Sequence, residues 1–295
     1  VKLQSYTADT LTLNCERSEF YITEGPWRGQ YMHDLYRDAY MPWEWHEPLQ
    51  QVAREEGITL FSAPFDFSAV DLLEDLHMPA YKIASPELID LELIERVGRT
   101  GKPIIISTGG GTLGEINAAI AAVHGTGNRN LCLMKCTSSY PAPLEDMNLN
   151  TIPHLQSIYG GPVGLSDHSM GITAPVVATS LGVNMIEKHF VLDKSDETVD
   201  SFFSLDPSEF SEMVSAVRQA EACLGSVEYT LESNPKRRSL YASQDIAAGQ
   251  RLTRDNLRNV RPGVGLPPRH LKSIIGRRAK RDFQRGEPIF WDMID

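Results

Sequence analysis

Two histidines that each follow a short apolar run are the residues of this sequence best suited to chemistry. The run VGLSDHSMG contains Ser166 and His168, and the run MIEKHF contains Glu187 and His189. Because side chains alternate along a strand, Ser166 shares a face with His168, and Glu187 shares a face with His189. A lone histidine of this kind is more often a hydrogen-bonded core residue. Two at matching strand ends favour a pair of ligands for one divalent metal ion, with Glu187 as a further ligand or as the orienting group.

Cationic and hydroxyl side chains close the other apolar runs in a similar way. They are Lys2, Lys82, Ser85, Ser107, Ser138 and Ser166. Together they would ring one pocket with the donors that a phosphate and a carboxylate require. The stretch STGGGTLGEI, residues 107–116, predicts a helix whose first N–H groups face an anion, although its three glycines alone equally indicate a tight turn. The combination predicts a small dianionic substrate.

These side chains need a scaffold that brings strand ends together. We predict strands at residues 1–6, 59–65, 80–85, 103–110, 131–137, 163–168 and 185–192, and helices at 42–57, 68–77, 87–101, 112–125 and 174–182. Strands that alternate with helices at this spacing indicate parallel βα units, as in a (β/α)8 TIM barrel, whose chemistry lies at the carboxyl ends of the strands. An open doubly wound sheet is the alternative fold. Since a closed barrel needs eight strands, we expect the first βα unit to precede Val1.

Composition narrows the class of protein. The 295 residues carry a formal net charge of −11, and they include only four cysteines, which favours reduced thiols in the cytoplasm. No apolar run approaches the ~20 residues of a membrane span, so we expect no membrane partner.

The charge is distributed unevenly along the chain. Residues 236–295 hold 14 Lys and Arg against 6 Asp and Glu, whereas residues 1–235 hold 14 Lys and Arg against 33 Asp and Glu. Such a split indicates a modular boundary. No aromatic or base-reading pattern accompanies the basic charge, so we do not expect nucleic-acid binding.

The basic carboxy-terminal part reads as a separate β-rich module. Residues 245–257 and 282–294 echo one another, each with a Gly-containing turn between apolar positions, which predicts hairpins. Between the two echoes, Arg261 lies on a loop punctuated by Pro and Gly, where it would serve as a substrate clamp or simply as a solvated charge. We therefore divide the chain into a barrel domain at 1–226, a linker at 227–236 and the β-rich module at 237–295.

The motifs together resemble a known family. The stretches VKLQSYTADTLTLN, PWEWH, AYKIAS, ISTGG, KCTSSYPAP, EDMNL, GLSDHS, EKHF, RRSLYA and RPGVGL resemble the sialic acid synthase family along essentially the whole chain. TADTLTLN, EGPW, LYRDAYMPWEWH, FSAPFD and DSFFSLDP are most similar to its pseudaminic acid branch. The resemblance implies a TIM barrel followed by a small antifreeze-like (SAF) domain. The family's opening strand motif, which ends in a Glu and an Asn-His pair, is not in the sequence, and this agrees with the expected missing unit.

The resemblance also implies an activity. Members condense phosphoenolpyruvate with an amino-sugar aldose to give a nine-carbon nonulosonic acid and phosphate. In this branch the sugar would be 2,4-diacetamido-2,4,6-trideoxy-L-altrose and the product pseudaminic acid. The neuraminate and legionaminate branches, with the same chemistry on another sugar, are the alternative enzymes. A barrel that binds a sugar phosphate without catalysis is the alternative outside enzymology.

Residue roles follow from the matching motifs. The catalytic set would be Lys82, His168, Glu187 and His189, and the two histidines would bind a divalent ion, with Mn²⁺ expected first and Mg²⁺ or Co²⁺ as alternatives. Phosphoenolpyruvate contacts would be Lys2, Lys82, Ser85, Ser107, Ser138 and Ser166. Sugar contacts would be Gln4, Glu87, Tyr140, Asp200 and Arg261. The family's dimers are domain-swapped, so Arg261 would reach the partner's active site in a homodimer.

Overall fold

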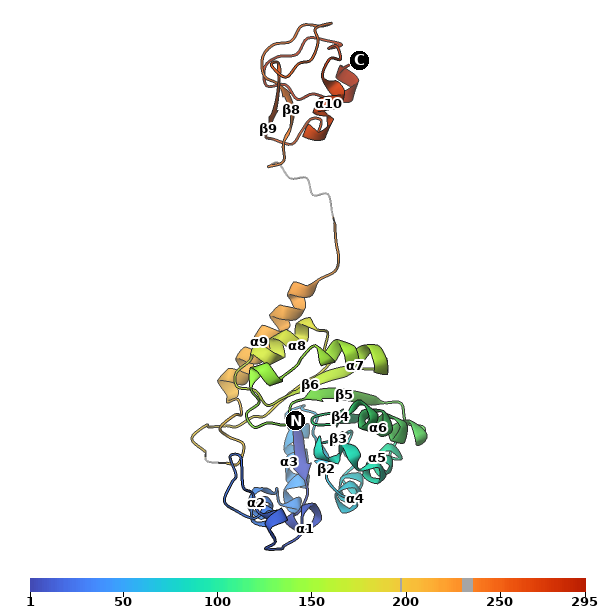
Figure 1. Cartoon of the computed structure of the whole chain (residues 1–295), viewed down its shortest axis with the longest axis vertical. Coiled ribbons are helices and arrows are strands. Elements are labelled where there is room, and N and C mark those ends of the chain that lie inside the picture. Colours follow the sequence, from blue (N-terminus) through green and yellow to red (C-terminus); the bar gives the residue numbers. More distant parts are fainter. Residues whose placement is uncertain (197, 230–235) are drawn as a thin grey trace. The chain divides into compact units, whose positions relative to one another are not determined.

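The computed structural model describes residues 1–196, 198–229 and 236–295, which fall into two compact units, Val1–Gly225 and Ser226–Asp295 (Figure 1). The predicted linker at 227–236 lies mainly in residues 230–235, which are outside the described residues. Of the helices within the described residues, none combines the length and the apolar character needed to cross a bilayer.

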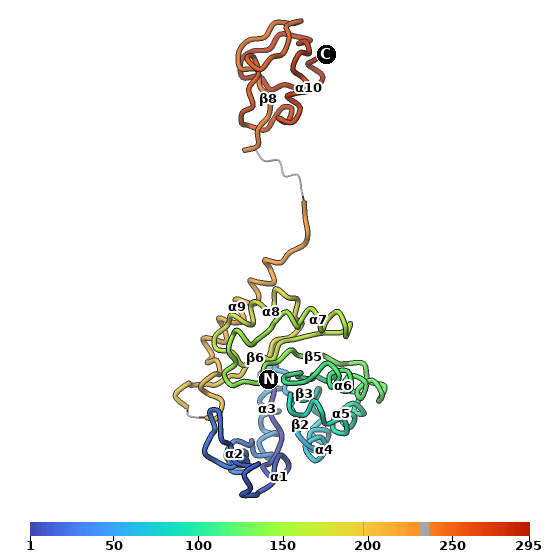
Figure 2. The backbone as a smooth tube through the Cα atoms, viewed as in Figure 1, coloured from blue at the N-terminus to red at the C-terminus, as the bar shows by residue number. Residues whose placement is uncertain are grey.

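The first unit is built on a curled sheet of seven parallel strands (Figure 2). The strands are β1 (Lys2–Ser5), β2 (Phe61–Pro64), β3 (Tyr81–Ile83), β4 (Ile104–Ser107), β5 (Leu131–Cys136), β6 (Val163–Asp167) and β7 (Ile186–Lys188). Each lies within a predicted run, and their order in the sheet is their order in the chain. Sequential order requires every crossover to run in the same direction, as in a barrel, so the open doubly wound alternative is wrong. The barrel-type fold is therefore confirmed.

Helices cover the outer face of this sheet. The longer ones are α3 (His46–Glu55), α4 (Phe67–Asp75), α5 (Leu91–Gly98), α6 (Leu113–Gly125), α7 (Thr151–Tyr159), α8 (Thr173–Ser180) and α9 (Pro207–Leu224). Two shorter helices, α1 (Ala8–Leu11) and α2 (Met32–Ala39), follow β1. The 3-10 turns are η1 (Ser18–Phe20), η2 (Trp43–Trp45), η3 (Pro86–Ile89), η4 (Leu144–Asp146), η5 (Pro268–His270) and η6 (Trp291–Met293).

The sequence pattern did not predict α7 or α9, although both carry local signals. Asp206 caps the first turn of α9 in a capping box with Glu209, and Pro207 occupies the first helical position. Gly160 ends α7 with φ +73°, a left-handed conformation that glycine adopts without strain. The apolar periodicity of both helices is interrupted by polar residues, so the caps are the clearer indication.

The hydrophobic core of the first unit lies between the strands and the helices. Leu73 of α4, Ile94 of α5 and Ile106 of β4 are fully buried in it. Burial of each such side chain stabilises the fold by about 1.5–3 kcal/mol. Strands β4 and β6 are buried along their whole length because helices cover one face and side chains fill the other. This packing fixes the strand ends that carry the polar residues.

The second unit has a small core of its own. Strands β8 (Ser239–Ala242) and β9 (Leu257–Val260) pair antiparallel, and α10 (Leu271–Ile274) follows. The two echoes in the sequence meet in an antiparallel bridge between Ile246 and Phe283, and both side chains are buried. Most other pairing is by isolated bridges, so the module is less regular than the predicted hairpins.

Candidate active site

A cavity of about 620 Å³ opens in the first unit at the carboxyl ends of the strands. It brings together most of the predicted site residues of this unit, namely Lys2, Gln4, Lys82, Ser85, Glu87, Ser107, Tyr140, Ser166, His168, Glu187, His189 and Asp200. Parallel strands all present their carboxyl ends at the same edge, so residues far apart in the chain meet there. The predicted strand-end cluster is therefore present in the structure.

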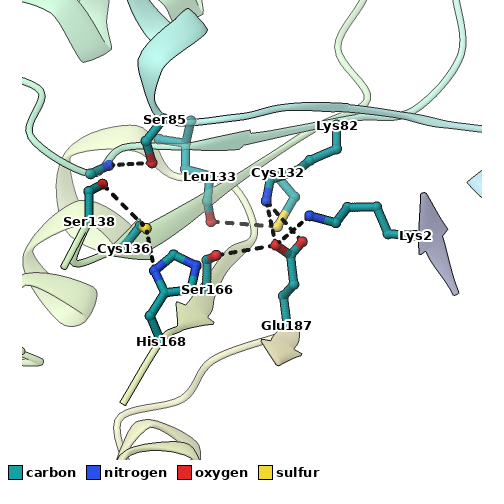
Figure 3. Close-up of polar contacts among 11 residues, drawn as sticks. Lys2, Lys82, Ser85, Cys132, Leu133, Cys136, Ser138, Ser166, His168 and Glu187 are labelled. Atoms are coloured by element: carbon teal, nitrogen blue, oxygen red, sulfur yellow. Dashed lines mark hydrogen bonds and ion pairs between the residues drawn. The ribbon is translucent and has the colours of Figure 1, made fainter. Parts of the chain in front are cut away.

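Two lysines and one carboxylate form the charged centre of the cavity (Figure 3). Lys2 Nζ lies 2.9 Å from Glu187 Oε1, and Lys82 Nζ lies 3.0 and 2.9 Å from the two carboxylate oxygens. Burial alone would raise the pKa of Glu187, but the two ammonium groups outweigh it and hold that pKa well below its usual range. Burial lowers the pKa of Lys82, and Glu187 partly offsets this. Two cations against one carboxylate leave the centre with a positive charge that suits an anionic ligand.

The direction of Glu187 differs from the expectation that it binds or orients the metal with the histidines. Its carboxylate instead accepts bonds from Lys2, Lys82 and, at 3.3 Å, from the hydroxyl of Ser166. Coulombic attraction explains the difference, since two buried ammonium groups are stronger partners for a carboxylate than a neutral imidazole is. Glu187 thus forms one charged cluster with Lys2 and Lys82.

The two histidines stand beside this cluster, with ring centroids 5.2 Å apart. His168 Nδ1 lies 2.9 Å from the carbonyl oxygen of Thr137, and His189 Nδ1 lies 3.3 Å from Asp200 Oδ2. Burial lowers the pKa of His189, opposed by Asp200. For His168, bonds with Cys136 and Thr137 outweigh burial and raise the pKa.

The donor set fits a divalent ion in part. Both Nδ1 atoms face an acceptor, which leaves both Nε2 atoms as the free ring nitrogens, the usual arrangement in metal-ligating histidines. No group of three or more His, Cys, Asp or Glu in metal-binding geometry occurs within the described residues. The protein could therefore supply two imidazoles, and an ion bound there would take its other ligands from water or substrate.

The predicted serines occupy different positions. Ser107 and Ser166 line the cavity, and the buried Ser107 Oγ has no hydrogen-bond partner among the described residues. Ser85 Oγ accepts the backbone N–H of Gly109 at 3.0 Å. Ser138 does not line the cavity and is exposed, because it lies two residues beyond β5, where the alternation of the strand no longer holds. Ser107 is thus the hydroxyl most ready for a ligand.

The amino end of α6 differs from the expectation of an anion site. Thr112 accepts the N–H of Glu115 at 3.3 Å, and Glu115 accepts the N–H of Thr112 at 2.7 Å. This capping box occupies the N–H groups of Thr112 and Glu115, and α6 contributes no residue to the cavity lining. The Gly-rich stretch therefore serves as the tight turn that was the other interpretation.

The structure adds residues that sequence reasoning missed. Cys136 closes β5 and lines the cavity, with its sulfur 3.9 Å from His168 Nδ1. Burial would raise the pKa of Cys136, but the bond with His168 and nearby charges lower it to about 7. The position of Cys136 at the end of β5, in line with the other strand ends, was the signal in the sequence that could have identified it.

The segment after β1 also contributes residues to the cavity lining. They are Tyr6, Leu11, Ile22, Trp27, Met32, Leu35, Tyr36 and Ala39.

Arg261 lies in the second unit, directly after β9, where it is exposed. The two units are separate bodies, so its predicted contact with a sugar stays a prediction.

Comparison with known proteins agrees with this architecture. The NeuB family matches residues 1–229, and the SAF domain matches residues 237–295. A pseudaminic acid synthase of Helicobacter pylori is 42% identical over 303 residues, covering 100% of this chain and 88% of the relative. An N,N'-diacetyllegionaminic acid synthase of Legionella pneumophila is 33% identical, covering 100% of this chain and 86% of the relative. The crystal structure of the spore coat polysaccharide biosynthesis protein SpsE of Bacillus subtilis has a TM-score of 0.63 at 33% identity, covering 100% of this chain and 86% of that chain. The chain belongs to the NeuB family and carries a SAF domain at its carboxy-terminal end.

Proposed function

We propose that this protein condenses phosphoenolpyruvate with 2,4-diacetamido-2,4,6-trideoxy-L-altrose to give pseudaminic acid and phosphate. The observation that carries the proposal is 42% identity to a pseudaminic acid synthase over the whole chain, against 33% to a legionaminic acid synthase. The cavity supports it, because a cationic half and a separate half lined by apolar and polar side chains suit two different substrates.

Phosphoenolpyruvate belongs at the cationic half. Lys2 and Lys82 would pair with its carboxylate and phosphate oxygens, while Glu187 keeps both ammonium groups in place. The free hydroxyl of Ser107 would donate to the same anion. C3 of phosphoenolpyruvate then attacks the sugar's aldehyde carbon, and the water that adds to C2 supplies the proton that turns the aldehyde oxygen into a hydroxyl. The C2–O bond to the phosphate then breaks, so that phosphate leaves and C2 becomes a ketone. Buried cations around the phosphate stabilise the charge that develops as it departs.

The aldehyde end of the sugar belongs beside the histidines. His168 and His189 would hold a divalent ion, for which we propose Mn²⁺, with Mg²⁺ or Co²⁺ as alternatives. Such an ion supplies Lewis-acid polarisation of a carbonyl oxygen. Asp200 and the carbonyl of Thr137 hold the two rings in orientation. Gln4, Glu87 and Tyr140 line the cavity as the remaining proposed sugar contacts within the first unit.

Assembly completes the proposal. A synthase domain at 1–226, a linker at 227–236 and a SAF domain at 237–295 would pair as a domain-swapped homodimer. Arg261 of one chain would then bind the sugar in the partner's cavity. We place the reaction in the cytoplasm, where the four cysteines, which are free in the structure, stay reduced.

The experiment measures phosphate release from phosphoenolpyruvate with and without each sugar and with and without Mn²⁺. We expect release only when the 2,4-diacetamido-2,4,6-trideoxy sugar and the metal are both present. His189→Ala should lose at least about 100-fold in turnover, as expected when one of two protein ligands is removed. The exposed His154→Ala is the matched control and should keep wild-type activity.

Three results would contradict parts of this proposal. Faster turnover of N-acetylmannosamine or of the legionaminate precursor would assign another sugar. Full activity of His189→Ala at saturating Mn²⁺ would remove the ligand role. Binding of both substrates without phosphate release would favour the non-catalytic barrel.

A further inference from the structure

The cavity has an apolar wall that phosphoenolpyruvate does not explain. Leu11 closes α1, and Met32, Leu35 and Ala39 lie on α2. The aliphatic residues that line the cavity from these segments, which we call the apolar wall, are Leu11, Ile22, Met32, Leu35, Ala39 and Val199, and Tyr6, Trp27 and Tyr36 line the cavity from the same stretch after β1. None of the wall side chains has a hydrogen-bond donor, and the only acceptor among them is the weak one of the Met32 thioether, whereas phosphoenolpyruvate is polar on nearly every side. The wall therefore faces the second substrate.

The wall is held in place as a built feature of the fold. Trp27 Nε1 donates to the carbonyl oxygen of Val199 at 3.1 Å and so ties the segment after β1 to the segment that follows β7. The Trp27 ring also packs on Tyr140, with ring centroids 5.6 Å apart. Tyr140 in turn packs on His168 at 4.4 Å. The apolar wall is thus fixed relative to the histidines where the aldehyde reacts.

The substituents of the proposed sugar differ in what they need from a protein. Both acetamido groups and the hydroxyls carry donors or acceptors, and Gln4, Glu87 and Asp200 in the same cavity can satisfy them. The C6 methyl group is the substituent without any polar atom. A hydroxyl placed against aliphatic side chains would lose its bonds to water without replacement. The wall therefore matches the methyl group and disfavours a hydroxyl.

We propose that the apolar wall binds the C6 methyl group of the 6-deoxy sugar and selects against sugars with a C6 hydroxyl. This inference rests on the proposed function and names the residues that determine its sugar specificity.

The experiment compares the 6-deoxy sugar with its C6-hydroxyl congener by kcat/KM at saturating phosphoenolpyruvate and Mn²⁺. Wild type should prefer the 6-deoxy sugar by about 10- to 100-fold, the range that a hydrophobic pocket achieves for one group. Met32→Gln and Leu35→Asn replace an apolar side chain by one of similar shape and smaller volume that carries an amide. Each should reduce the preference by about fivefold or more, while the KM for phosphoenolpyruvate stays within about twofold.

Leu13→Asn is the matched control, because Leu13 lies in the same segment, is 66% exposed and does not line the cavity. It should keep the wild-type preference. Leu35 is 8% exposed, so its variant is checked by thermal unfolding. Val199→Thr, a nearly isosteric change at a less buried position, is the second variant if Leu35→Asn does not fold.

The possible outcomes distinguish a failure of the apolar wall from a failure of the proposed synthase function. Equal turnover of both sugars by wild type, or an unchanged preference in folded Met32→Gln and Val199→Thr, would overturn the apolar wall while leaving the synthase function intact. If wild type releases no phosphate with the 6-deoxy sugar, the proposed function fails. Calorimetric measurement of the binding of both sugars to wild type and to Met32→Gln then still tests the apolar wall. If the wall binds the methyl group, wild type binds the 6-deoxy sugar more tightly than its C6-hydroxyl congener, and Met32→Gln shows a smaller difference in affinity.

Discussion

Two buried glutamates of the same cavity have pKa values that are shifted in opposite directions. Glu187 has two ammonium partners, and its pKa lies well below the usual range although burial alone would raise it. Glu87 has no such partner, so burial, reinforced by the charge of Asp90, raises its pKa to about 7. Its Oε2 atom is buried without a hydrogen-bond partner among the described residues. Charge compensation thus decides which carboxyl group ionises at neutral pH.

Glu87 therefore predicts a dependence of stability on pH. An acid whose pKa is about 7 in the folded state and ~4.3 in the unfolded state binds its proton more tightly when folded, so folding loses stability as the pH rises through this window. Glu87→Gln mimics the protonated form. We expect nearly equal free energies of unfolding for wild type and variant at pH 4, and a variant that is more stable by about 3–4 kcal/mol at pH 8.

Urea unfolding at the two pH values measures this difference. The exposed Glu145→Gln should show no such pH-dependent gain. An equal difference between Glu87→Gln and wild type at both pH values would mean that folding does not raise the pKa of Glu87.

At the level of elements, strands β6 and β7 carry different chemistry on their two faces. Ser166 and Glu187 face the cavity, whereas Asp167 and Lys188 form an ion pair of 2.7 Å on the opposite face, with both side chains fully buried. Lys188 also donates to the carbonyl oxygen of Ser169, and Asp167 accepts the N–H of Ser169 at 2.8 Å. The pair therefore joins the two strand ends from which the histidines extend.

We expect Lys188→Met to cost about 3–5 kcal/mol of unfolding free energy, because it leaves the Asp167 carboxylate buried without its cation. The double variant Asp167→Asn/Lys188→Met removes both charges and should recover about half of that loss or more. Denaturant unfolding of the single and double variants measures the coupling.

The surface pair Lys194–Glu209 provides the control, since both side chains are 38% exposed. Lys194→Met should cost less than about 1 kcal/mol. Additive losses in the Asp167 and Lys188 variants would show that the buried pair does not act as one unit.

At the level of the whole molecule, the proposed swapped dimer makes each active site depend on two chains. His189→Ala removes a residue from the barrel, and Arg261→Ala removes one from the SAF domain. In a hybrid dimer of the two variants, one site would then combine an intact barrel with an intact Arg261. Co-expression should restore about a quarter of wild-type turnover, because random pairing gives about half hybrid dimers, each with one intact site.

The readout is phosphate release by the co-expressed and the separately expressed variants. Arg269, another exposed arginine of the same module, provides the control. The Arg269→Ala variant takes the place of Arg261→Ala and should be fully active when it is expressed alone. Absence of recovery from hybrid dimers isolated by two affinity tags would place Arg261 in the site of its own chain or outside the site.

The sequence by itself determined the order of the seven strands, the positions of α3, α4, α5, α6 and α8, and the residues at the strand ends. Apolar runs and their spacing are local properties, so the positions of β1 to β7 and of Lys82, His168 and His189 followed from them. Period-two alternation correctly assigned Ser166 and His168 to the cavity face. Ser138 lies beyond the end of its strand, where this rule does not apply, so its contact with phosphoenolpyruvate stays a prediction.

Only the tertiary structure decided which groups pair. Glu187 has Lys2 and Lys82 as neighbours across 185 and 105 residues of chain, and no local pattern could rank them above the histidines. Likewise, Leu35 shows the apolar spacing of any amphipathic helix, and only the path of α2 along the cavity makes it part of the cavity lining. Periodicity encodes which face of an element is buried, whereas the partner on that face is set by packing between elements distant in sequence.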